Sequence, residues 1–250
     1  MRESSLSLSA LRQRIAAIED RRGAMPGTCF TLGIESIPAL ECGRLHEVYA
    51  AEAEDRASAA GFALMLALRA ADGPVLWLRA ERSVRLHPPG LAELGMNPAR
   101  LILVVAPDER ALLKAAADGL RCAGLGAVLI ETAKALDLTQ SRRLTLAAEQ
   151  SGVTALLLPG AVAPAPSAAQ TRWRVASAAS TPLAANAPGM TAFDISLLRH
   201  RAGREGLGWR VEWDRDRQSF RQSFRGAPPV SGAVPAFSAD GPAVLRERAA

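Results

Sequence analysis

The sequence predicts an α/β fold, with a mainly parallel sheet flanked by helices and extended by antiparallel strands at its C-terminal end. Short apolar runs alternate with helical segments from about residue 45 to residue 158, which is typical of parallel strands joined by crossover helices. After Pro159 the pattern changes to segments in which polar and apolar residues alternate with period two, as in antiparallel strands. These two patterns predict the fold class.

Each element of the parallel region has its own signal. Apolar runs predict strands at residues 45–49, 75–78, 101–105, 127–130 and 154–158. The segments between them predict helices at 57–71, 91–95, 109–122 and 140–150. Asp108 and Thr139 are expected to cap the last two helices, because their side chains can accept the free N–H groups of a first turn. Ser151 and Gly152 are expected to end the last one.

The antiparallel region follows an uncharged loop, residues 161–170, that is rich in Ala, Pro and Ser. Period-two alternation predicts strands at 173–176, 193–197 and 209–213, with a hairpin turn at 203–208. From Gly226 onward, Pro, Gly, Ala and Ser dominate, which predicts a disordered tail.

Three parts are therefore expected: an N-terminal arm at 1–27, a core at 28–225 and the tail at 226–250. Within the arm, residues 6–22 place leucine and isoleucine near one helical face. This helix either packs on the core or docks on another protein.

Composition excludes several classes of protein. No apolar run approaches the ~20 residues of a membrane span, and the N-terminus lacks a signal-peptide core. The three cysteines, Cys29, Cys42 and Cys122, have no paired spacing, so neither a disulfide framework nor a zinc site is expected. We therefore expect a cytoplasmic protein without a metal and without membrane contact. The net charge of +5 is almost entirely arginine and is only a weak indication of nucleic-acid binding.

Residues 43–58 have the layout of a strand, a phosphate-binding loop and a helix. A working loop reads G-x-x-x-x-G-K-[ST], because its glycines let backbone N–H groups surround phosphates, while its Lys and hydroxyl contact phosphate and Mg²⁺. Here Ala50 and Asp55 replace the glycines, Arg56 replaces the Lys, and Ala57 replaces the hydroxyl residue. Carboxylates from Glu52, Glu54 and Asp55 would also repel a polyphosphate. The sequence therefore predicts a vestigial site without a cofactor, and a chain that is not an enzyme.

Two more carboxylates stand at the ends of predicted parallel strands, where α/β folds carry functional groups. Glu81 and Glu131 could orient water or Mg²⁺ in a nucleotide-hydrolysing site. The alternative is that they end the strands and pair with nearby arginines, namely Arg56, Arg79 or Arg82.

Arginine is dense in residues 199–225, where two phenylalanines are interleaved with it. This segment could bind single-stranded nucleic acid, dock a protein partner or form a solvated face, and the composition does not separate the three. The candidate partner-binding residues are Arg199, Arg201, Arg210, Arg217, Phe220, Arg221, Phe224 and Arg225.

The ordered set of segments resembles the recombinase RecA. Residues 43–48 resemble the strand before its phosphate-binding loop, 78–81 the strand that carries its catalytic glutamate, and 126–131 its Walker B strand with Glu131 in place of aspartate. The closing strands 173–177, 193–199 and 209–213 follow, and loop 161–170 falls where RecA has its second DNA-binding loop.

Combined with the degenerate loop, Ser141-Arg142-Arg143-Leu144 on the last helix and the basic tail, this set resembles the ImuA family of RecA-like, SulA-related bacterial proteins. The resemblance implies a RecA-like core and a damage-inducible accessory role in mutagenic translesion synthesis. The implied partners are ImuB, a Y-family polymerase homologue, and through it an error-prone replicative-type DNA polymerase, with RecA and DNA as further candidates. Two other functions stay open: a weak ATPase with an atypical site, and a SulA-type inhibitor of the division protein FtsZ.

Overall fold

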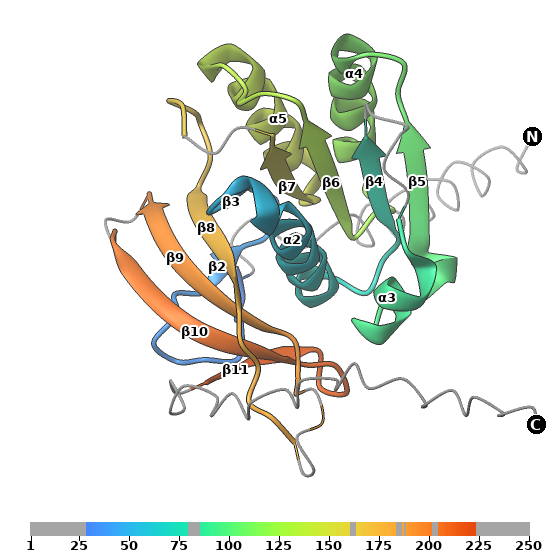
Figure 1. The fold of residues 1–250 in the computed structure, drawn as a ribbon. Coiled ribbons are helices and arrows are strands. Elements are labelled where there is room, and N and C mark those ends of the chain that lie inside the picture. The colour runs from blue at the N-terminus through green and yellow to red at the C-terminus, as the bar shows by residue number, and fades with distance from the viewer. Residues whose placement is uncertain are drawn as a thin grey trace, which may run out of the picture.

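The computed structural model describes residues 29–79, 86–160, 164–183, 187, 189–201 and 205–223. The predicted N-terminal arm and C-terminal tail lie outside these residues. The part of the chain that is described forms a nine-stranded mixed sheet with helices on both faces, and a separate two-stranded sheet (Figure 1).

The large sheet has parallel strands on one side and antiparallel strands on the other. Its strands have the spatial order β11-β10-β9-β8-β3-β7-β6-β4-β5. The parallel strands are β3 (Leu45–Ala50), β4 (Val75–Arg79), β5 (Leu101–Val105), β6 (Ala127–Thr132), β7 (Thr154–Pro159) and β8 (Thr171–Ala178). The antiparallel strands are β9 (Ala192–His200), β10 (Leu207–Asp214) and β11 (Ser219–Gln222). The predicted α/β class with its antiparallel extension is confirmed. Strand β8, which was expected among the antiparallel strands, runs parallel to β3 and antiparallel to β9, so it joins the two halves of the sheet.

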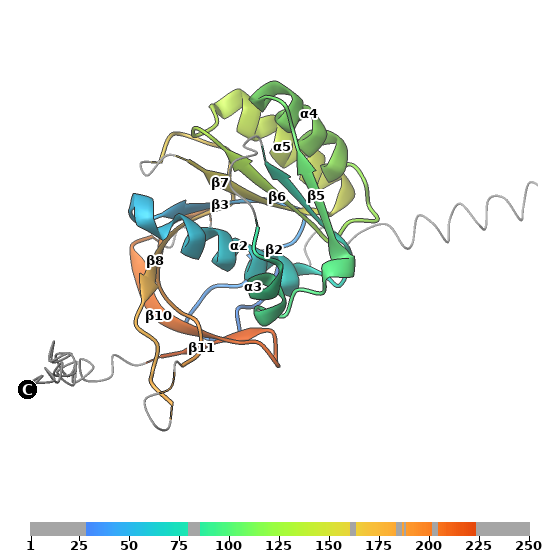
Figure 2. The same ribbon diagram turned by 45° about the vertical axis from the view of Figure 1, so that its right-hand side comes forward.

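The helices form a layer on each face of the sheet. Helices α4 (Glu109–Leu120) and α5 (Leu138–Ser151) lie together on one face, and α2 (Arg56–Ala70) and the short α3 (Pro88–Glu93) lie on the other (Figure 2). None of the helices in the described ranges is both long enough and apolar enough to cross a membrane.

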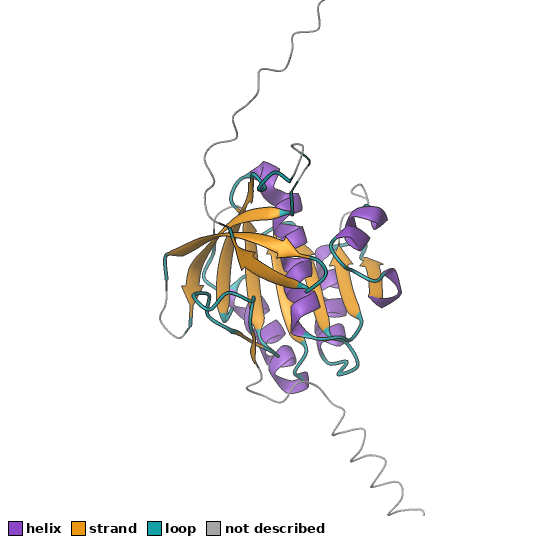
Figure 3. Ribbon diagram, turned by 90° about the horizontal axis from the view of Figure 1, so that it is seen from below, coloured by secondary structure: helices purple, strands orange, loops and turns teal. Residues whose placement is uncertain are grey.

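Helix α2 is the centre of the larger core, because the sheet bends so that its antiparallel strands also lie against this helix (Figures 2 and 3). The ring of Phe62 lies 6.0 Å from Trp173 of β8, 6.1 Å from Phe193 of β9 and 5.3 Å from Phe220 of β11, measured between centroids. A helix that is apolar on most sides must be covered on most sides. The bent sheet provides that cover for α2.

The ends of α4 and α5 show one prediction confirmed and one wrong. Asp108 caps α4, accepting a hydrogen bond from the N–H of Ala111 at 2.7 Å. The cap of α5 is Asp137 and not Thr139: its carboxylate accepts from the N–H of Gln140 at 2.7 Å, and the Gln140 side chain returns a bond to the Asp137 N–H at 3.0 Å. This reciprocal pair satisfies two free donors, so the helix begins earlier than the sequence indicated.

Three short strands were not predicted. Strands β1 (Cys29–Phe30) and β2 (Leu40–Glu41) form the small sheet, and β11 closes the large one. The N–H of Phe220 donates to the carbonyl of Leu32 at 2.8 Å, which ties the segment between β1 and β2 to β11 of the large sheet. The Phe220 side chain is 2% exposed, so it lies in the core and not on the surface where a partner could reach it.

We predict that Phe220→Ala destabilises the fold by about 3–5 kcal/mol, because it removes a buried ring that packs on both Phe62 and Trp213. The free energy of unfolding in urea measures this change. Leu207→Ala, at a position that is 38% exposed, is the matched control and should cost about 0.5 kcal/mol. An equal effect of both substitutions would contradict the core position of Phe220.

Candidate functional site

The loop between β3 and α2 occupies the position of a phosphate-binding loop, but three of its N–H groups are already bonded. The N–H of Ala51 donates to the carbonyl of Val175 on β8 at 2.8 Å. The N–H of Glu52 donates to the Asp55 carboxylate at 3.3 Å, and the N–H of Asp55 donates to the carbonyl of Glu52 at 3.1 Å. A phosphate cradle depends on free N–H groups. This loop therefore lacks the glycines of a cradle, and three of its N–H groups are already bonded within the protein.

Asp55, at the position of the second glycine, ties this loop to strand β8. Its Oδ1 accepts hydrogen bonds from the N–H and the hydroxyl of Ser177, each at 2.8 Å. The side chain is buried, and the hydrogen bond from the Ser177 N–H is the main reason that the pKa of Asp55 is lowered. The residue that removes the cradle thus has a structural role.

Arg56 and Ala57 take the positions of the Lys and the hydroxyl residue at the start of α2. Arg56 is exposed, and its Nη2 donates to the carbonyl of Gly160 after β7 at 3.0 Å. The expected pairing of Arg56 with a carboxylate is therefore not what the structure shows. Ala57 has no group that could hold Mg²⁺.

Glu131, at the end of β6, is bonded to two donors on the neighbouring strand β4. Its Oε1 accepts from Nε1 of Trp77 at 2.6 Å, and its Oε2 pairs with Nε of Arg79 at 2.9 Å. The ion pair with Arg79 is one of the pairings that the sequence indicated. A carboxylate with both oxygens bonded to protein donors is poorly placed to hold a metal. Glu81 lies outside the described residues.

A cavity of about 840 Å³ opens beside these residues, at the carboxyl ends of the parallel strands. Its walls come from α2, α3 and the ends of β3, β4, β6 and β7. Ala50, Arg56, Ala57, Arg79 and Glu131 all line it, so the structure brings most of the predicted site positions together. Within the described ranges, no three His, Cys, Asp or Glu side chains gather as they would around a metal ion.

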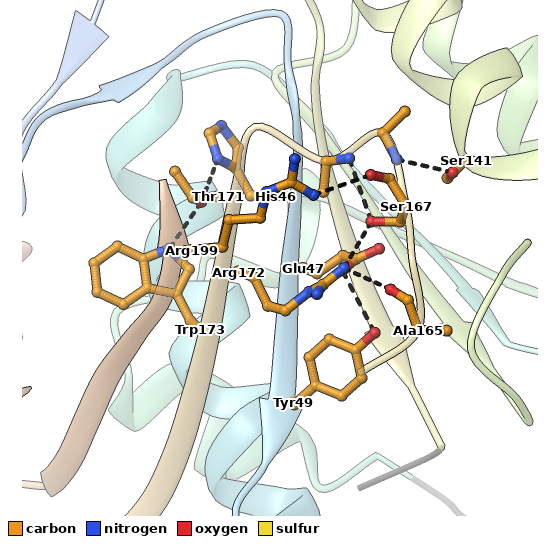
Figure 4. A network of polar contacts seen from close by, with 12 residues as sticks. His46, Glu47, Tyr49, Ser141, Ala165, Ser167, Thr171, Arg172, Trp173 and Arg199 are labelled. Atoms are coloured by element: carbon orange, nitrogen blue, oxygen red, sulfur yellow. Dashed lines mark hydrogen bonds and ion pairs between the residues drawn. The ribbon is translucent and has the colours of Figure 1, made fainter. Parts of the chain in front are cut away.

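A second polar site lies between β3, β8 and the loop at 164–170 (Figure 4). Glu47 of β3 is 1% exposed and pairs with Nε of Arg172 on β8 at 2.8 Å. Nη2 of Arg172 also donates to the carbonyl of Ala165 at 2.7 Å and to the hydroxyl of Ser167 at 3.0 Å. One guanidinium therefore neutralises a buried carboxylate and holds the loop that follows β7.

Other contacts fix the same loop. The N–H of Ala168 donates to the hydroxyl of Ser141 on α5 at 3.1 Å, and Nη1 of Arg199 donates to the carbonyl of Ser167 at 3.3 Å. Arg199, a candidate for partner binding, thus contacts its own chain here. The described residues of this loop are therefore anchored, and they carry no charge.

Burial also sets the protonation of two neighbours of this pair. Desolvation raises the pKa of Tyr49 to about 12, with the Glu47 charge as the next cause. Desolvation lowers the pKa of His46 to about 4. His46 Nε2 lies 2.9 Å from the carbonyl of Glu41, which only accepts, so Nε2 carries the proton and Nδ1 accepts from Thr171 at 2.8 Å. His46 is a neutral core histidine.

Several predicted partner-binding arginines are paired within the antiparallel strands. Arg210 forms two bonds to Asp194, at 2.8 and 2.6 Å, and Arg221 forms two to Glu212, at 3.1 and 2.8 Å. Arg217 lies 3.9 Å from Asp214 and is largely exposed. Arg201 is exposed, whereas Phe224 and Arg225 lie outside the described residues. Pairing reduces the charge that this face could offer to phosphates.

Sequence reasoning missed the pair of Glu47 and Arg172. A signal was present, because a charged residue inside a short buried strand requires a partner. The sequence does not say which of the chain's many arginines is that partner.

Comparison with known proteins identifies the family. Two proteins named Protein ImuA, from Caulobacter vibrioides strains NA1000 / CB15N and ATCC 19089 / CIP 103742 / CB 15, are each 38% identical to this chain over 186 residues. The match covers 68% of this chain and 75% of each relative. The chain belongs to the ImuA family.

Membership in the ImuA family confirms the resemblance seen in the sequence. Among solved structures, that of the RadB recombinase is similar at a TM-score of 0.48 and 15% identity, covering 74% of this chain and 92% of that one. No protein-family model matches the chain.

We predict that Asp55→Ala lowers the free energy of unfolding by about 1–3 kcal/mol near pH 6, because it removes an acceptor from two Ser177 donors. The pKa of Asp55 is lower in the folded chain than its ordinary value of 3.8, so its contribution is present above that value and is lost as the pH falls further. Urea unfolding should show a smaller difference in the free energy of unfolding between this variant and wild type at about pH 3 than at about pH 6. The exposed neighbour variant Glu54→Ala is the control, and a difference that stays constant with pH would contradict the tether.

We also predict that Arg172→Met costs about 3–5 kcal/mol of stability, because it leaves the buried Glu47 without its cation. Adding Glu47→Leu to this variant should recover much of the loss, since an apolar pair avoids burying a charge. Arg217→Met removes an exposed arginine from a 3.9 Å pair and should cost about 0–1 kcal/mol. Chemical denaturation of all three variants tests this, and the absence of any recovery in the double variant would argue against the proposed origin of the loss.

Proposed function

We propose that this chain is a non-catalytic accessory protein in SOS-induced translesion DNA synthesis. Membership in the ImuA family links it to the ImuA/ImuB mutagenesis system. Its partners are ImuB, a Y-family polymerase homologue, and through ImuB an error-prone replicative-type polymerase. RecA and DNA are further candidate partners, and the protein acts in the cytoplasm.

The non-catalytic part of this proposal is supported by the loop after β3. Its N–H groups at Ala51, Glu52 and Asp55 are bonded within the protein. Binding the phosphates of ATP there would require breaking these bonds and bringing the ligand close to the Glu54 carboxylate. Neither the Arg56 side chain nor Glu131 is arranged to offset that cost, because Arg is bulky in a phosphate cradle and Glu131 is already paired.

The adaptor part of the proposal rests on those candidate arginines that are neither buried nor closely bonded to a carboxylate. Arg201 and Arg217 stay exposed, Arg201 directly after β9 and Arg217 in the turn between β10 and β11. Exposed arginines are frequent hot spots of protein interfaces. ImuB is therefore proposed to contact the antiparallel strands of the sheet together with residues 224–250.

Co-expression of the full chain with ImuB, read by co-purification, tests the adaptor role. A chain that ends at residue 223 keeps β11 and the Phe220 contacts, so it should fold and yet retain much less ImuB. Arg201→Glu with Arg217→Glu should weaken ImuB binding roughly tenfold or more, whereas Arg121→Glu on α4 should not. Full ImuB binding by the shortened, folded chain would overturn the proposed contact.

Calorimetric titration with Mg²⁺ and ATP tests the non-catalytic role separately, and no saturable binding is expected. ATP binding that is abolished by Glu131→Gln would favour the weak ATPase instead.

A further inference from the structure

We propose that the cavity between α2, α3 and the carboxyl ends of the parallel strands binds an uncharged, mainly apolar small molecule. The cavity overlaps the positions at which a nucleotide site was predicted to be vestigial, but its lining differs in chemistry from a nucleotide site. This inference is independent of the adaptor role.

The space exists because the first two turns of α2 place small residues towards it. Ala57, Ala60 and Gly61 line the cavity, and their spacing of i, i+3 and i+4 places them on the same side of the helix. A Cβ added at Gly61 would make ordinary contacts, 3.8 Å from Cδ1 of Leu94 and 4.0 Å from Cζ of Phe193. Nearby positions of α2 carry large side chains such as Phe62 and Met65, which are fully buried in the core. The hollow is therefore a local property of this face.

The volume of the cavity suits a small organic ligand. At about 840 Å³ it lies within the range of roughly 300–1,000 Å³ that is usual for such sites. Much of the lining is apolar, since side chains from all sides face the space: Val48, Trp77, Leu86, Leu91, Leu94 and Leu158. These are the features that define a pocket for a compact apolar molecule.

The charges of the described residues around the cavity cancel. Among these residues, four charged side chains line it, Glu54, Arg56, Arg79 and Glu131, and the last two form an ion pair at 2.9 Å. The described lining therefore offers no net charge with which to attract an anion or a cation. An uncharged ligand loses less solvation on entering such a space than a charged one does.

Polar groups that could orient a ligand are few. The hydroxyl of Thr132 donates to the carbonyl of Lys134 at 2.7 Å, and Trp77 donates to Glu131. His87 and Arg56 stand at the lining with part of their donor capacity available. A ligand with one or two polar atoms on an apolar body matches this set, and a polyphosphate does not.

The test uses N-phenyl-1-naphthylamine, an uncharged apolar fluorophore, titrated into the full chain. We expect saturable binding of one probe per chain, with energy transfer from Trp77, which lines the cavity. Ala57→Leu and Ala60→Leu each fill part of the space and should weaken binding roughly tenfold or more. Ser58→Leu, on the same helix but outside the lining, should bind like wild type. Circular dichroism and thermal unfolding show whether each variant is folded.

Two results would overturn the proposal. The first is binding that does not saturate, or that has equal affinity in wild type and in the folded filling variants. The second is displacement of the probe by Mg²⁺ and ATP, which would indicate a polyphosphate site. Trp77→Phe keeps an aromatic ring and should reduce the energy transfer, whereas unchanged transfer would place the probe elsewhere. Loss of ImuB binding would leave these outcomes unaffected.

Discussion

The buried ion pair of Glu47 and Arg172 lies where the parallel and antiparallel halves of the sheet meet. The two residues face each other across the parallel strands β3 and β8. A carboxylate that is 1% exposed is costly unless it is paired, so the position of β8 against β3 is constrained by this contact. The same guanidinium holds the loop at Ala165 and Ser167, and the extension from β9 to β11 follows from β8. The strands that cover the outer side of α2 are thus joined to the parallel half of the sheet at this junction.

Next to that junction, the loop between β3 and α2 is held by its own side chains. The Asp55 carboxylate accepts two hydrogen bonds from Ser177 and so connects the loop to β8. In the same way Glu131 bonds to Trp77 and Arg79 of the next strand. Polar groups that would face a nucleotide in an active site instead satisfy one another, while the space beside them is lined mainly by apolar and small side chains.

The arginine-rich segment shows how composition can mislead about a surface. Arg199 holds a loop, Arg210 and Arg221 are each bonded twice to a carboxylate, and Phe220 is in the core. Only Arg201 and Arg217 of the described candidates remain exposed and loosely held. The binding surface that the antiparallel strands can offer is therefore smaller than the number of arginines implies.

The class of fold, the positions of most parallel strands along the chain and the absence of phosphate-binding residues at Ala50, Asp55, Arg56 and Ala57 could be predicted from the sequence. These are properties of local patterns and of residue identity, which need no knowledge of distant contacts. The order of the strands in the sheet and the contacts of those residues are set by the tertiary structure: Asp55 reaches Ser177 across 122 positions, and Glu47 reaches Arg172 across 125. It also decided that Phe220 is buried and that small residues on α2 leave a cavity. Long-range pairing and packing depend on how the strands meet in space, and no local pattern encodes which partner each side chain finds.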